Sequence, residues 1–381
     1  MTLGTMKNRY DAIVIGVGAM GSAALFHLAR RGRKVLGIEQ FSLPHEYGSS
    51  HGITRIIRLA YYEHPSYVPL LRRAFELWRE LQAMASVQLL HVTGSIDAGP
   101  PGNIVFEGSR QCCELHDLPY EVLSSSQMTE RFPGYHLPAN TLAVLQPDGG
   151  FLLPELCVAS HVRLAESFGA DVHTREKVIA WDPIGSGVRV ITESGSYEAD
   201  TLIVAAGAWM NKVVPQLKYL ASPERQVVVW MEPLRPEWFR PECFPVFNLA
   251  VEEGRYYGFP AFGAPGFKIG RYHHFKETIN PDELDRSCYP TDEYLLRAFA
   301  ERYFPQGAGH LSTMQSCIFT NTPDEHFILD TLASFPQVVI ASPCSGHGFK
   351  FASVIGEILA DLADAGRTRH DISLYRLARF I

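Results

Sequence analysis

The glycine-rich segment GVGAMG at residues 16–21 constrains the fold of this chain more than any other feature. A short apolar run, YDAIVI at residues 10–15, precedes it and predicts a buried parallel strand. The following SAALFHLARRG repeats apolar residues at helical spacing, and KVLGIE at residues 34–39 predicts the next strand. That strand ends with an acid 18 residues after the last glycine of the motif. This order predicts a β-α-β unit that binds a dinucleotide.

Each glycine of this unit has a physical task. Gly16 permits the tight turn, Gly18 lets the backbone approach a pyrophosphate, and Gly21 lets the helix and the strand pack closely. The unpaired N–H groups at the helix start attract phosphate, and Glu39 can accept hydrogen bonds from a ribose. NAD and FAD both satisfy this geometry. A glycine turn without a ligand is the alternative.

Composition excludes several classes of protein. The chain has 381 residues, and at about 150 residues per domain we expect two or three domains. Hydrophobic residues make up 46%, which is typical of a globular protein, and the net charge of -7 argues against a broad nucleic-acid surface. No apolar run approaches the roughly 18 residues of a membrane span. The seven cysteines form no C-x-x-C pair, and neither end carries a targeting pattern, so we expect a cytoplasmic protein.

Periodicity and turn residues predict the remaining elements. We expect helices at residues 67–81, 125–131, 154–168, 292–302 and 349–363, and strands at 89–97, 141–146, 172–182, 188–193, 197–206 and 338–341. Dinucleotide-binding elements therefore recur along the chain, with two β-rich insertions between them. We expect an α/β fold in which residues 1–88, 148–222 and 323–381 form a Rossmann-like domain, and residues 89–147 and 223–322 form a substrate domain. The ligand should lie at their interface.

Two further segments combine glycines with charged residues. GSSHGITRIIR at residues 48–58 offers Arg55 and Arg58 as planar donors to an anion, with a solvated basic loop as the alternative. CSGHGFK at residues 344–350 joins a strand to a helix, and its free N–H groups suit an anion such as a reduced flavin ring. A structural glycine turn is the alternative there. Lys268 lies within the apolar strand FKIG, which indicates either a buried cation at a site or a side chain directed at solvent.

The histidines and cysteines are weaker signals by themselves. His273, His274 and His326 lack the spacing of zinc ligands, so structural or surface roles are the better interpretation. Cys317 in QSCIFTNTPDEHF is, from composition alone, one semi-buried thiol. We therefore expect no bound metal.

Five segments of the chain, taken in order, are similar to the flavoprotein amine oxidases of the monomeric sarcosine oxidase family, which includes N-methyltryptophan oxidase. The segments are GVGAMGS, SSHGITRIIRLAY, YYGFP followed by GFKIG, SCIFTNTPDEHFILD and SGHGFKF. The resemblance implies an FAD-binding domain of the glutathione-reductase/D-amino-acid-oxidase type with an inserted β-sheet-rich substrate domain. It also implies an enzyme that oxidises a secondary amino acid (N-methyl, N-alkyl or cyclic) at the C–N bond, while O2 is reduced to H2O2.

The resemblance implies roles for individual residues. Arg58 and Lys350 match the residues that hold the substrate carboxylate, and Lys268 matches the lysine that activates O2. Tyr257 matches a tyrosine of the substrate pocket. Cys317 matches the cysteine that binds FAD through a thioether, with Cys344 as the rival attachment point. The implied FAD-binding residues are Gly16, Gly18, Met20, Gly21, Glu39, Gln40, Ser49, His51, Thr54, Arg55, Val178, Gly207, Trp209, Cys317, Ser345, Gly346, His347, Gly348 and Lys350.

Three departures from the family pattern concern the substrate. Phe319 stands where sarcosine oxidases have a tyrosine, and Asn248 stands where a pocket methionine is found. An extra residue after Gly270 leaves two candidates, Tyr272 and His273, for the active-site histidine of the family, and His273 is taken as the catalytic candidate. These departures make sarcosine itself doubtful as the substrate, whereas the shared carboxylate-binding pair still favours an amino acid.

Other functions remain as alternatives. A nicotinamide-linked dehydrogenase uses the same fingerprint, but a flavin–nicotinamide reductase usually needs two such motifs, and only one is convincing here. A flavin-dependent dehydrogenase and a non-catalytic flavin subunit of a larger amine oxidase are the others. Retention of Lys268, Arg58 and Lys350 argues against the silent subunit. We expect a monomer that uses a small amino acid and O2, without nucleic acid or membrane as a partner.

Overall fold

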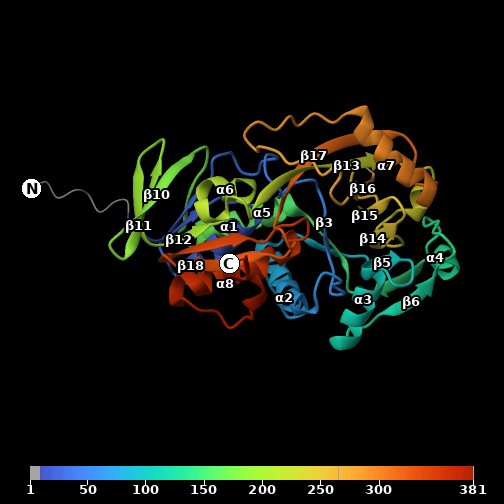
Figure 1. The fold of residues 1–381 in the computed structure, drawn as a ribbon, viewed down its shortest axis with the longest axis horizontal. Coiled ribbons are helices and arrows are strands. Elements are labelled where there is room, and N and C mark those ends of the chain that lie inside the picture. Colours follow the sequence, from blue (N-terminus) through green and yellow to red (C-terminus); the bar gives the residue numbers. More distant parts are fainter. Residues whose placement is uncertain (1–8, 265, 381) are drawn as a thin grey trace, which may run out of the picture.

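Two eight-stranded sheets and one three-stranded sheet make up the computed structural model, which describes residues 9–264 and 266–380. The first large sheet and its helices occupy one half of the molecule, and the second large sheet occupies the other half (Figure 1). Segments from both ends of the chain meet in the first half, as the blue and red ribbons show (Figure 1).

The first sheet contains the predicted β-α-β unit. β1 (Arg9–Ile15), α1 (Ala19–Arg30) and β2 (Val35–Ile38) follow one another, and β1 pairs in parallel with both β2 and β12. The sheet has the order β10-β11-β12-β1-β2-β9, and β19 pairs with β12 and with β18. Its other strands are β9 (Asp171–His173), β10 (Val178–Ile184), β11 (Gly187–Thr192), β12 (Ser196–Val204), β18 (Ile328–Leu332) and β19 (Phe335–Ser342).

Helices from distant parts of the chain cover this sheet. α1 contacts α5 (Pro154–Ser167) and α8 (Ala352–Ala365), and α8 also contacts α2 (Val68–Ala85). Their apolar stripes are buried in one continuous core with the sheet. A short helix, α6 (Met210–Val213), follows β12. The predicted helices at 67–81, 154–168 and 349–363 are thus confirmed, the last beginning with a 3-10 turn at Phe349–Phe351.

The second sheet has the order β17-β13-β16-β15-β14-β5-β7-β6. It buries an aromatic core against α7 (Pro290–Tyr303). Its strands are β5 (Ser95–Gly99), β6 (Glu121–Ser124), β7 (Leu142–Gln146), β13 (Ser222–Met231), β14 (Val246–Val251), β15 (Gly254–Phe259), β16 (Phe267–Arg271) and β17 (Leu311–Asn321). These strands lie within or at the edge of the two predicted insertions, together with α3 (Ile104–Leu115) and α4 (Ser125–Arg131). The predicted domain boundaries themselves stay a prediction.

The small sheet pairs three distant segments. β8 (Gly150–Leu152) lies between β3 (Arg55–Ile57) and β4 (Leu90–Val92). β3 belongs to the arginine-containing segment that follows β2. This pairing places the segment at the junction of the two halves (Figure 1).

Two predicted strands are wrong as continuous elements. Residues 89–97 form β4 and β5 in different sheets, because Gly94 has φ +78° and turns the chain. Residues 172–182 form β9 and β10, because the chain turns at Arg175, whose φ is +56°. The first break lies where apolar residues continue on both sides of a single glycine, and the second lies in the polar run HTREK at residues 173–177, which the prediction wrongly included in one strand.

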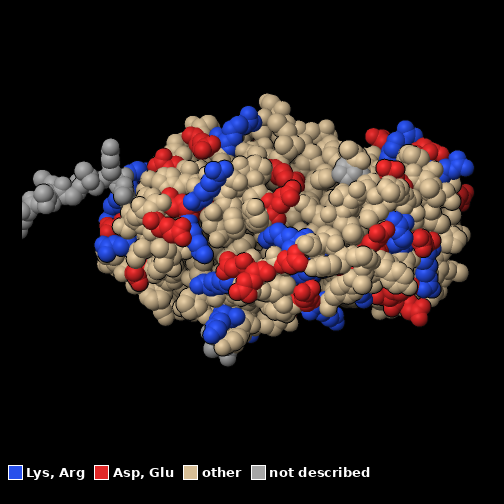
Figure 2. Space-filling model, turned by 90° about the horizontal axis from the view of Figure 1, so that it is seen from above, with Lys and Arg blue, Asp and Glu red and all other residues tan. Residues whose placement is uncertain are grey.

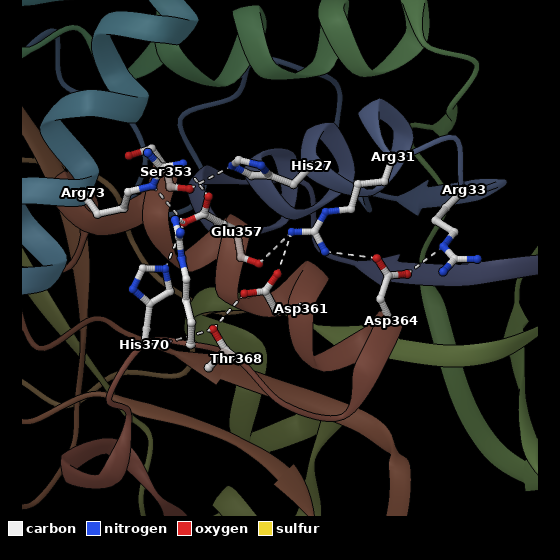
Figure 3. A network of polar contacts seen from close by, with 11 residues as sticks. His27, Arg31, Arg33, Arg73, Ser353, Glu357, Asp361, Asp364, Thr368 and His370 are labelled. Atoms are coloured by element: carbon white, nitrogen blue, oxygen red, sulfur yellow. Dashed lines mark hydrogen bonds and ion pairs between the residues drawn. The ribbon is translucent and has the colours of Figure 1, made fainter.

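Charged residues connect the helices on the outer side of the first sheet (Figure 3). Arg31 at the end of α1 bridges Asp361 and Asp364 of α8 at 2.7 and 3.0 Å. Arg73 of α2 binds both oxygens of Glu357 at 3.0 and 2.6 Å, and His370 Nε2 lies 2.9 Å from the same carboxylate. These contacts, with burial opposing them, hold the pKa of Glu357 well below its usual range.

The surface facing the viewer in Figure 2 carries charges of both signs side by side. Lys and Arg residues lie next to Asp and Glu on this face, without the continuous basic stripe that is typical of a nucleic-acid-binding surface. Among the described residues, no helix combines the length and apolar character needed to cross a bilayer. No group of three or more His, Cys, Asp or Glu side chains in the same residues could hold a metal ion.

We expect Glu357→Gln to lower the free energy of unfolding by about 1–3 kcal/mol at pH 7, because it removes a bidentate charged partner of Arg73. The loss should shrink at strongly acidic pH, where the wild-type carboxylate is also protonated. Urea titrations at several pH values measure both effects. Glu76→Gln is the matched control, since Glu76 binds the same arginine at 2.7 Å but is 61% exposed and should cost under about 0.5 kcal/mol. Equal losses for both variants would contradict this prediction.

Candidate functional site

A cavity of about 880 Å³ lies where the carboxyl ends of β1, β2 and β12 face the second sheet. Ligand pockets range over roughly 300–1,000 Å³, so this one is large enough for a cofactor together with a small substrate. Its lining includes backbone after β1 and β12 and side chains of β14, β15 and β17. Parallel sheets bind ligands at this edge, because the connecting loops there are free to form a pocket.

The cavity brings together most of the residues singled out from the sequence. Its lining includes Gly16, Gly18, Met20, Glu39, Gln40, Ser49, Arg55, Arg58, Val178, Gly207, Trp209, Asn248, Tyr257, Cys317, Phe319, Gly346, His347, Gly348 and Lys350. Six predicted residues lie outside the lining: Gly21, His51, Thr54, Lys268, His273 and Ser345. Ser345 is buried behind its loop, where its hydroxyl accepts a hydrogen bond from Thr322 N at 3.2 Å.

Steric crowding explains why glycines occupy the turn after β1, as the sequence predicts. Gly16 has φ +85°, and a Cβ on it would lie 2.6 Å from the carbonyl oxygen of Ala205. A Cβ on Gly21 would lie 1.8 Å from the carbonyl oxygen of Gly16. Gly21 therefore allows α1 to pack against the turn and does not contact the cavity, as its predicted packing role requires.

The start of α1 and the end of β2 form a polar wall of the cavity. Glu39 Oε2 accepts a hydrogen bond from Val17 N at 2.9 Å, and Oε1 accepts one from Phe41 N at 3.1 Å. Gly18, the N-cap of α1, has no side chain to cap the helix. The N–H groups of that turn suit a pyrophosphate, and Glu39 suits ribose hydroxyls. The residues of this wall therefore fit the dinucleotide part of FAD.

The loop before β3 is held by two cations. Lys268 is buried on β16, and its Nζ donates to the carbonyl oxygens of Gly52 at 2.6 Å and Thr54 at 2.9 Å. Arg55 donates to Thr54 O at 2.9 Å and to Ser49 O at 3.1 Å while it lines the cavity. Burial, and Arg55, lower the pKa of Lys268 well below its usual value. Lys268 is thus the buried cation that the sequence allowed, directed at the loop.

His51 lies within the same loop and is fully buried. Neither ring nitrogen makes a hydrogen bond of good geometry to a described residue, although the side chain of Gln315 lies near enough to oppose the fall in its pKa. Burial, and secondly Arg55, lower its pKa to about 3, so the ring is neutral near pH 7. An unpaired buried imidazole is costly, which is consistent with a site completed by a group other than these side chains.

Two cysteines line the cavity, and their electrostatic surroundings differ. Burial raises the pKa of both thiols, that of Cys344 to about 12. For Cys317, the cations Arg55, Lys268 and Arg286 oppose this rise, whereas no cation acts on Cys344 in this way. Cys317 is therefore the cysteine whose thiolate is better stabilised.

Arg58 lies at another part of the cavity wall and is 2% exposed. It binds both carboxylate oxygens of Glu63, at 2.9 and 2.8 Å, and lies 3.5 Å from Asp97. Burial raises the pKa of Asp97, against the opposing effect of Arg58. For Glu63, burial also acts to raise the pKa, but Arg58, His347, Lys350 and Arg255 together outweigh it and the pKa falls to about 2. A guanidinium between two buried carboxylates remains charged and fixed in place.

Lys350 lines the cavity as a second buried cation. Its Nζ donates to the carbonyl oxygen of His347 at 2.7 Å, and no other acceptor binds it among the described residues. An ammonium can donate three hydrogen bonds, so two remain for a ligand. Burial, and secondly Arg58, lower the pKa of Lys350 to about 7. An anion in the cavity would satisfy these donors and restore the charged form.

The structure separates Tyr272 from His273. Tyr272 lines the cavity, and its hydroxyl donates to Gly346 O at 3.3 Å. His273 points instead at two carboxylates, with Nδ1 3.0 Å from Glu224 and Nε2 3.0 Å from Glu325. These contacts raise the pKa of His273 to about 9. The structure therefore places Tyr272 at the cavity and pairs the ring of His273 with carboxylates outside the lining, which speaks against His273 as the residue that faces a ligand.

Sequence reasoning missed Glu63, Asp97 and Arg255. Arg255 lies over the ring of Tyr272 with its guanidinium carbon 3.6 Å from the centroid. Glu63 and Asp97 are the partners of Arg58. An acid in the otherwise apolar strand SIDAG was a usable signal, since a buried carboxylate needs a partner. The partner could not be named without the fold.

Comparison with known proteins gives consistent matches over the whole chain. The family described as FAD dependent oxidoreductase matches residues 11–362. Monomeric sarcosine oxidase of Bacillus sp. (strain NS-129) is 41% identical over 379 residues, which cover 98% of each chain. N-methyl-L-tryptophan oxidase of Yersinia pestis (strain Pestoides F) is 35% identical, over 97% of this chain and 99% of that protein.

Solved structures show the same fold. NikD, an unusual amino acid oxidase essential for nikkomycin biosynthesis, superimposes in its open form with a TM-score of 0.84 and 25% identity. The superposition covers 97% of this chain and 98% of that chain.

We expect the affinity for a simple carboxylate such as butyrate to fall as the pH rises through about 7, where Lys350 loses its proton. His347, whose pKa is lowered to about 4, stays neutral over this range. Titration calorimetry between pH 6 and 9 should show the dissociation constant rising several-fold. Lys350→Met should bind butyrate more weakly and without this pH dependence. A wild-type dissociation constant that is constant from pH 6 to 9 would refute the prediction.

Proposed function

This chain belongs to the FAD dependent oxidoreductase family, and we propose that it oxidises the C–N bond of a secondary amino acid to an imine. The matches confirm the predicted resemblance and the predicted α/β fold. The observation that carries the substrate proposal is Lys350, which lines the cavity with two free donors beside Arg58, whose Nε has no partner among the described residues. Such donors suit a carboxylate.

FAD, when bound, would accept two electrons and two protons from the substrate and pass them to O2, giving H2O2 and an imine that water hydrolyses. The glycine turn, Glu39 and the start of α1 would hold its dinucleotide part. The loop carrying Gly346 and Gly348 would face the ring. Its backbone N–H groups suit the negative charge of the reduced ring.

The side chains around the remaining cavity have proposed roles. Lys350 and Arg58 bind the carboxylate and so fix the position of the reacting carbon–nitrogen bond. Tyr257, whose pKa burial raises, keeps its proton and offers a neutral hydroxyl. Phe319, at the site of the family tyrosine, presents an apolar ring. Tyr272 takes the place that the family gives to a histidine.

Lys268 is proposed as the cation that favours electron transfer to O2. Its Nζ lies beside the loop of Thr54 and Arg55, next to the cavity wall, where the protonated amine would supply a positive charge. Three oxygen atoms accept hydrogen bonds from its Nζ, which stabilises the charged form against burial. A charge held by backbone carbonyls would remain in place throughout a turnover.

A flavin-dependent dehydrogenase and a flavin subunit of a larger complex are the alternatives. Reaction with O2 without added acceptor separates the oxidase from both. We further propose that the protein is a monomer and that it is cytoplasmic. The monomer is proposed because relatives at 38–42% identity carry the name monomeric sarcosine oxidase.

The principal test is H2O2 formation by the purified flavoprotein with a panel of N-methyl, N-alkyl and cyclic amino acids. At least one should be oxidised without added NAD, and its decarboxylated analogue should be a poor substrate. Arg58→Ala should lower kcat/KM by an amount that corresponds to about 2–4 kcal/mol of lost transition-state stabilisation. This is the scale for losing a charged hydrogen-bond partner in a closed site. Equal turnover of an amino acid and its decarboxylated analogue would remove the carboxylate pair from the mechanism.

The second test concerns a covalent bond between Cys317 and FAD. Joining a thiol to the flavin methyl carbon removes two electrons and two protons, which the flavin and then O2 can accept. Because cations surround Cys317 and not Cys344, only the former should form the thioether. After acid denaturation, mass spectrometry should find flavin attached in the wild type and in Cys344→Ser, but released from Cys317→Ser. Complete release of flavin from the wild type would show that no such bond forms.

A further inference from the structure

A row of polar side chains crosses the second sheet where it faces the cavity. Asp97 on β5 lies directly opposite Asn248 on β14, and Asn248 lies opposite Tyr257 on β15. Residues opposite one another on neighbouring strands share a face, so the three side chains are neighbours. Gly270, next in the row, leaves room for the tyrosine, because a Cβ there would lie 2.4 Å from the ring of Tyr257. Asn248 and Tyr257 line the cavity.

The carboxylate of Asp97 determines how the amide of Asn248 is oriented. Asn248 Nδ2 donates to Asp97 Oδ1 at 2.7 Å. Asp97 Oδ2 accepts from the hydroxyl of Ser109 at 2.8 Å and lies 3.5 Å from Arg58 Nη1. Asp97 is 1% exposed, and all three groups around it are donors. Because a carboxylate only accepts, the NH2 group of Asn248 must face Asp97.

The other end of this amide is therefore an acceptor at the cavity. No described residue donates to Asn248 Oδ1, and this atom is not among the fully buried polar atoms that lack a partner. Asn248 itself is only 4% exposed and lines the cavity. A ligand that covers an unpaired carbonyl oxygen removes its water, and this weakens binding unless the ligand donates a hydrogen bond to that oxygen. The cavity thus favours a donor at this point.

We propose that Asn248 determines substrate specificity by accepting a hydrogen bond from the substrate side chain, and that Asp97 is its positioning residue. The inference rests on the proposed function, since the carboxylate bound by Arg58 and Lys350 orients the substrate. Asp97 contacts both Asn248 and Arg58, so the acceptor lies beside the carboxylate end. The substrate is then a secondary amino acid whose side chain carries a hydroxyl or N–H group.

Binding of amine-free acids to the flavoprotein tests this without turnover. Glycolate, 3-hydroxypropionate and 4-hydroxybutyrate are compared with propionate, butyrate and valerate, which replace the hydroxyl by a methyl group of similar size. Dissociation constants come from changes in the flavin absorbance spectrum. The wild type should bind the hydroxylated member about tenfold more tightly at one chain length at least. Asn248→Leu should reverse that preference, and Asp97→Asn should abolish it, because a neutral amide no longer fixes the orientation of Asn248.

Asn321 provides the matched control. Its Nδ2 also donates to a carboxylate, that of Glu224 at 2.9 Å, but it does not line the cavity. Asn321→Leu should keep the wild-type preference. If the acids bind without preference for the hydroxyl, or if Asn248→Leu keeps that preference, the assignment of Asn248 is wrong while the proposed function stands. If no acid binds at all, the carboxylate site, the proposed function and the assignment of Asn248 all fail.

Turnover gives an independent readout of the same acceptor. N-methylserine and 2-(methylamino)butyric acid differ by a hydroxyl against a methyl group. The wild type should favour N-methylserine in kcat/KM, mainly through KM, and Asn248→Leu should favour the other acid. A preference of the wild type for the methyl compound would overturn the proposal.

Discussion

The cavity depends on the hydrogen bonds that the buried side chain of Lys268 makes with the loop before β3. This side chain comes from the middle of the second sheet and binds backbone oxygens of Gly52 and Thr54, in the segment that leaves the first sheet. That segment continues into β3 with Arg55 and Arg58, which both line the cavity. A buried ammonium without these acceptors would be very costly, so the loop and the strand each require the other. One contact thus positions both arginines relative to the two sheets.

Charge is balanced locally on each side of this junction. Arg58 is neutralised by Glu63 and Asp97, so it can be buried at 2% exposure without a ligand. Among the described residues, the Nζ of Lys350 donates to one carbonyl oxygen, and burial depresses its pKa. Arg58 and Lys350 therefore differ in their electrostatic state. The guanidinium is already paired with carboxylates, whereas a bound anion would favour the charged form of Lys350.

The carboxylate of Asp97 connects the two proposed recognition sites. It contacts Arg58 on one side and Asn248 on the other, so the proposed carboxylate binding and the proposed side-chain recognition would share one buried acidic residue. Phe319 and Tyr272 make the facing wall more aromatic, with ring centroids 5.6 Å apart. A cavity with an acceptor on one wall and aromatic rings on another distinguishes substrates by polarity as well as by size.

The sequence by itself determined the β-α-β unit through local spacing, and its resemblance to a known family implied the FAD-type fold and most of the cavity lining. Glycines at fixed intervals, an acid after a strand, and five motifs in order need no knowledge of long-range contacts. Tertiary structure alone showed that Tyr272 and not His273 lines the cavity, since the two are neighbours on one segment and the turn at His273, with φ +53°, places its ring against Glu224. It also decided that Asp97 meets Asn248, because a partnership across 151 residues arises from strand register, which no local pattern specifies.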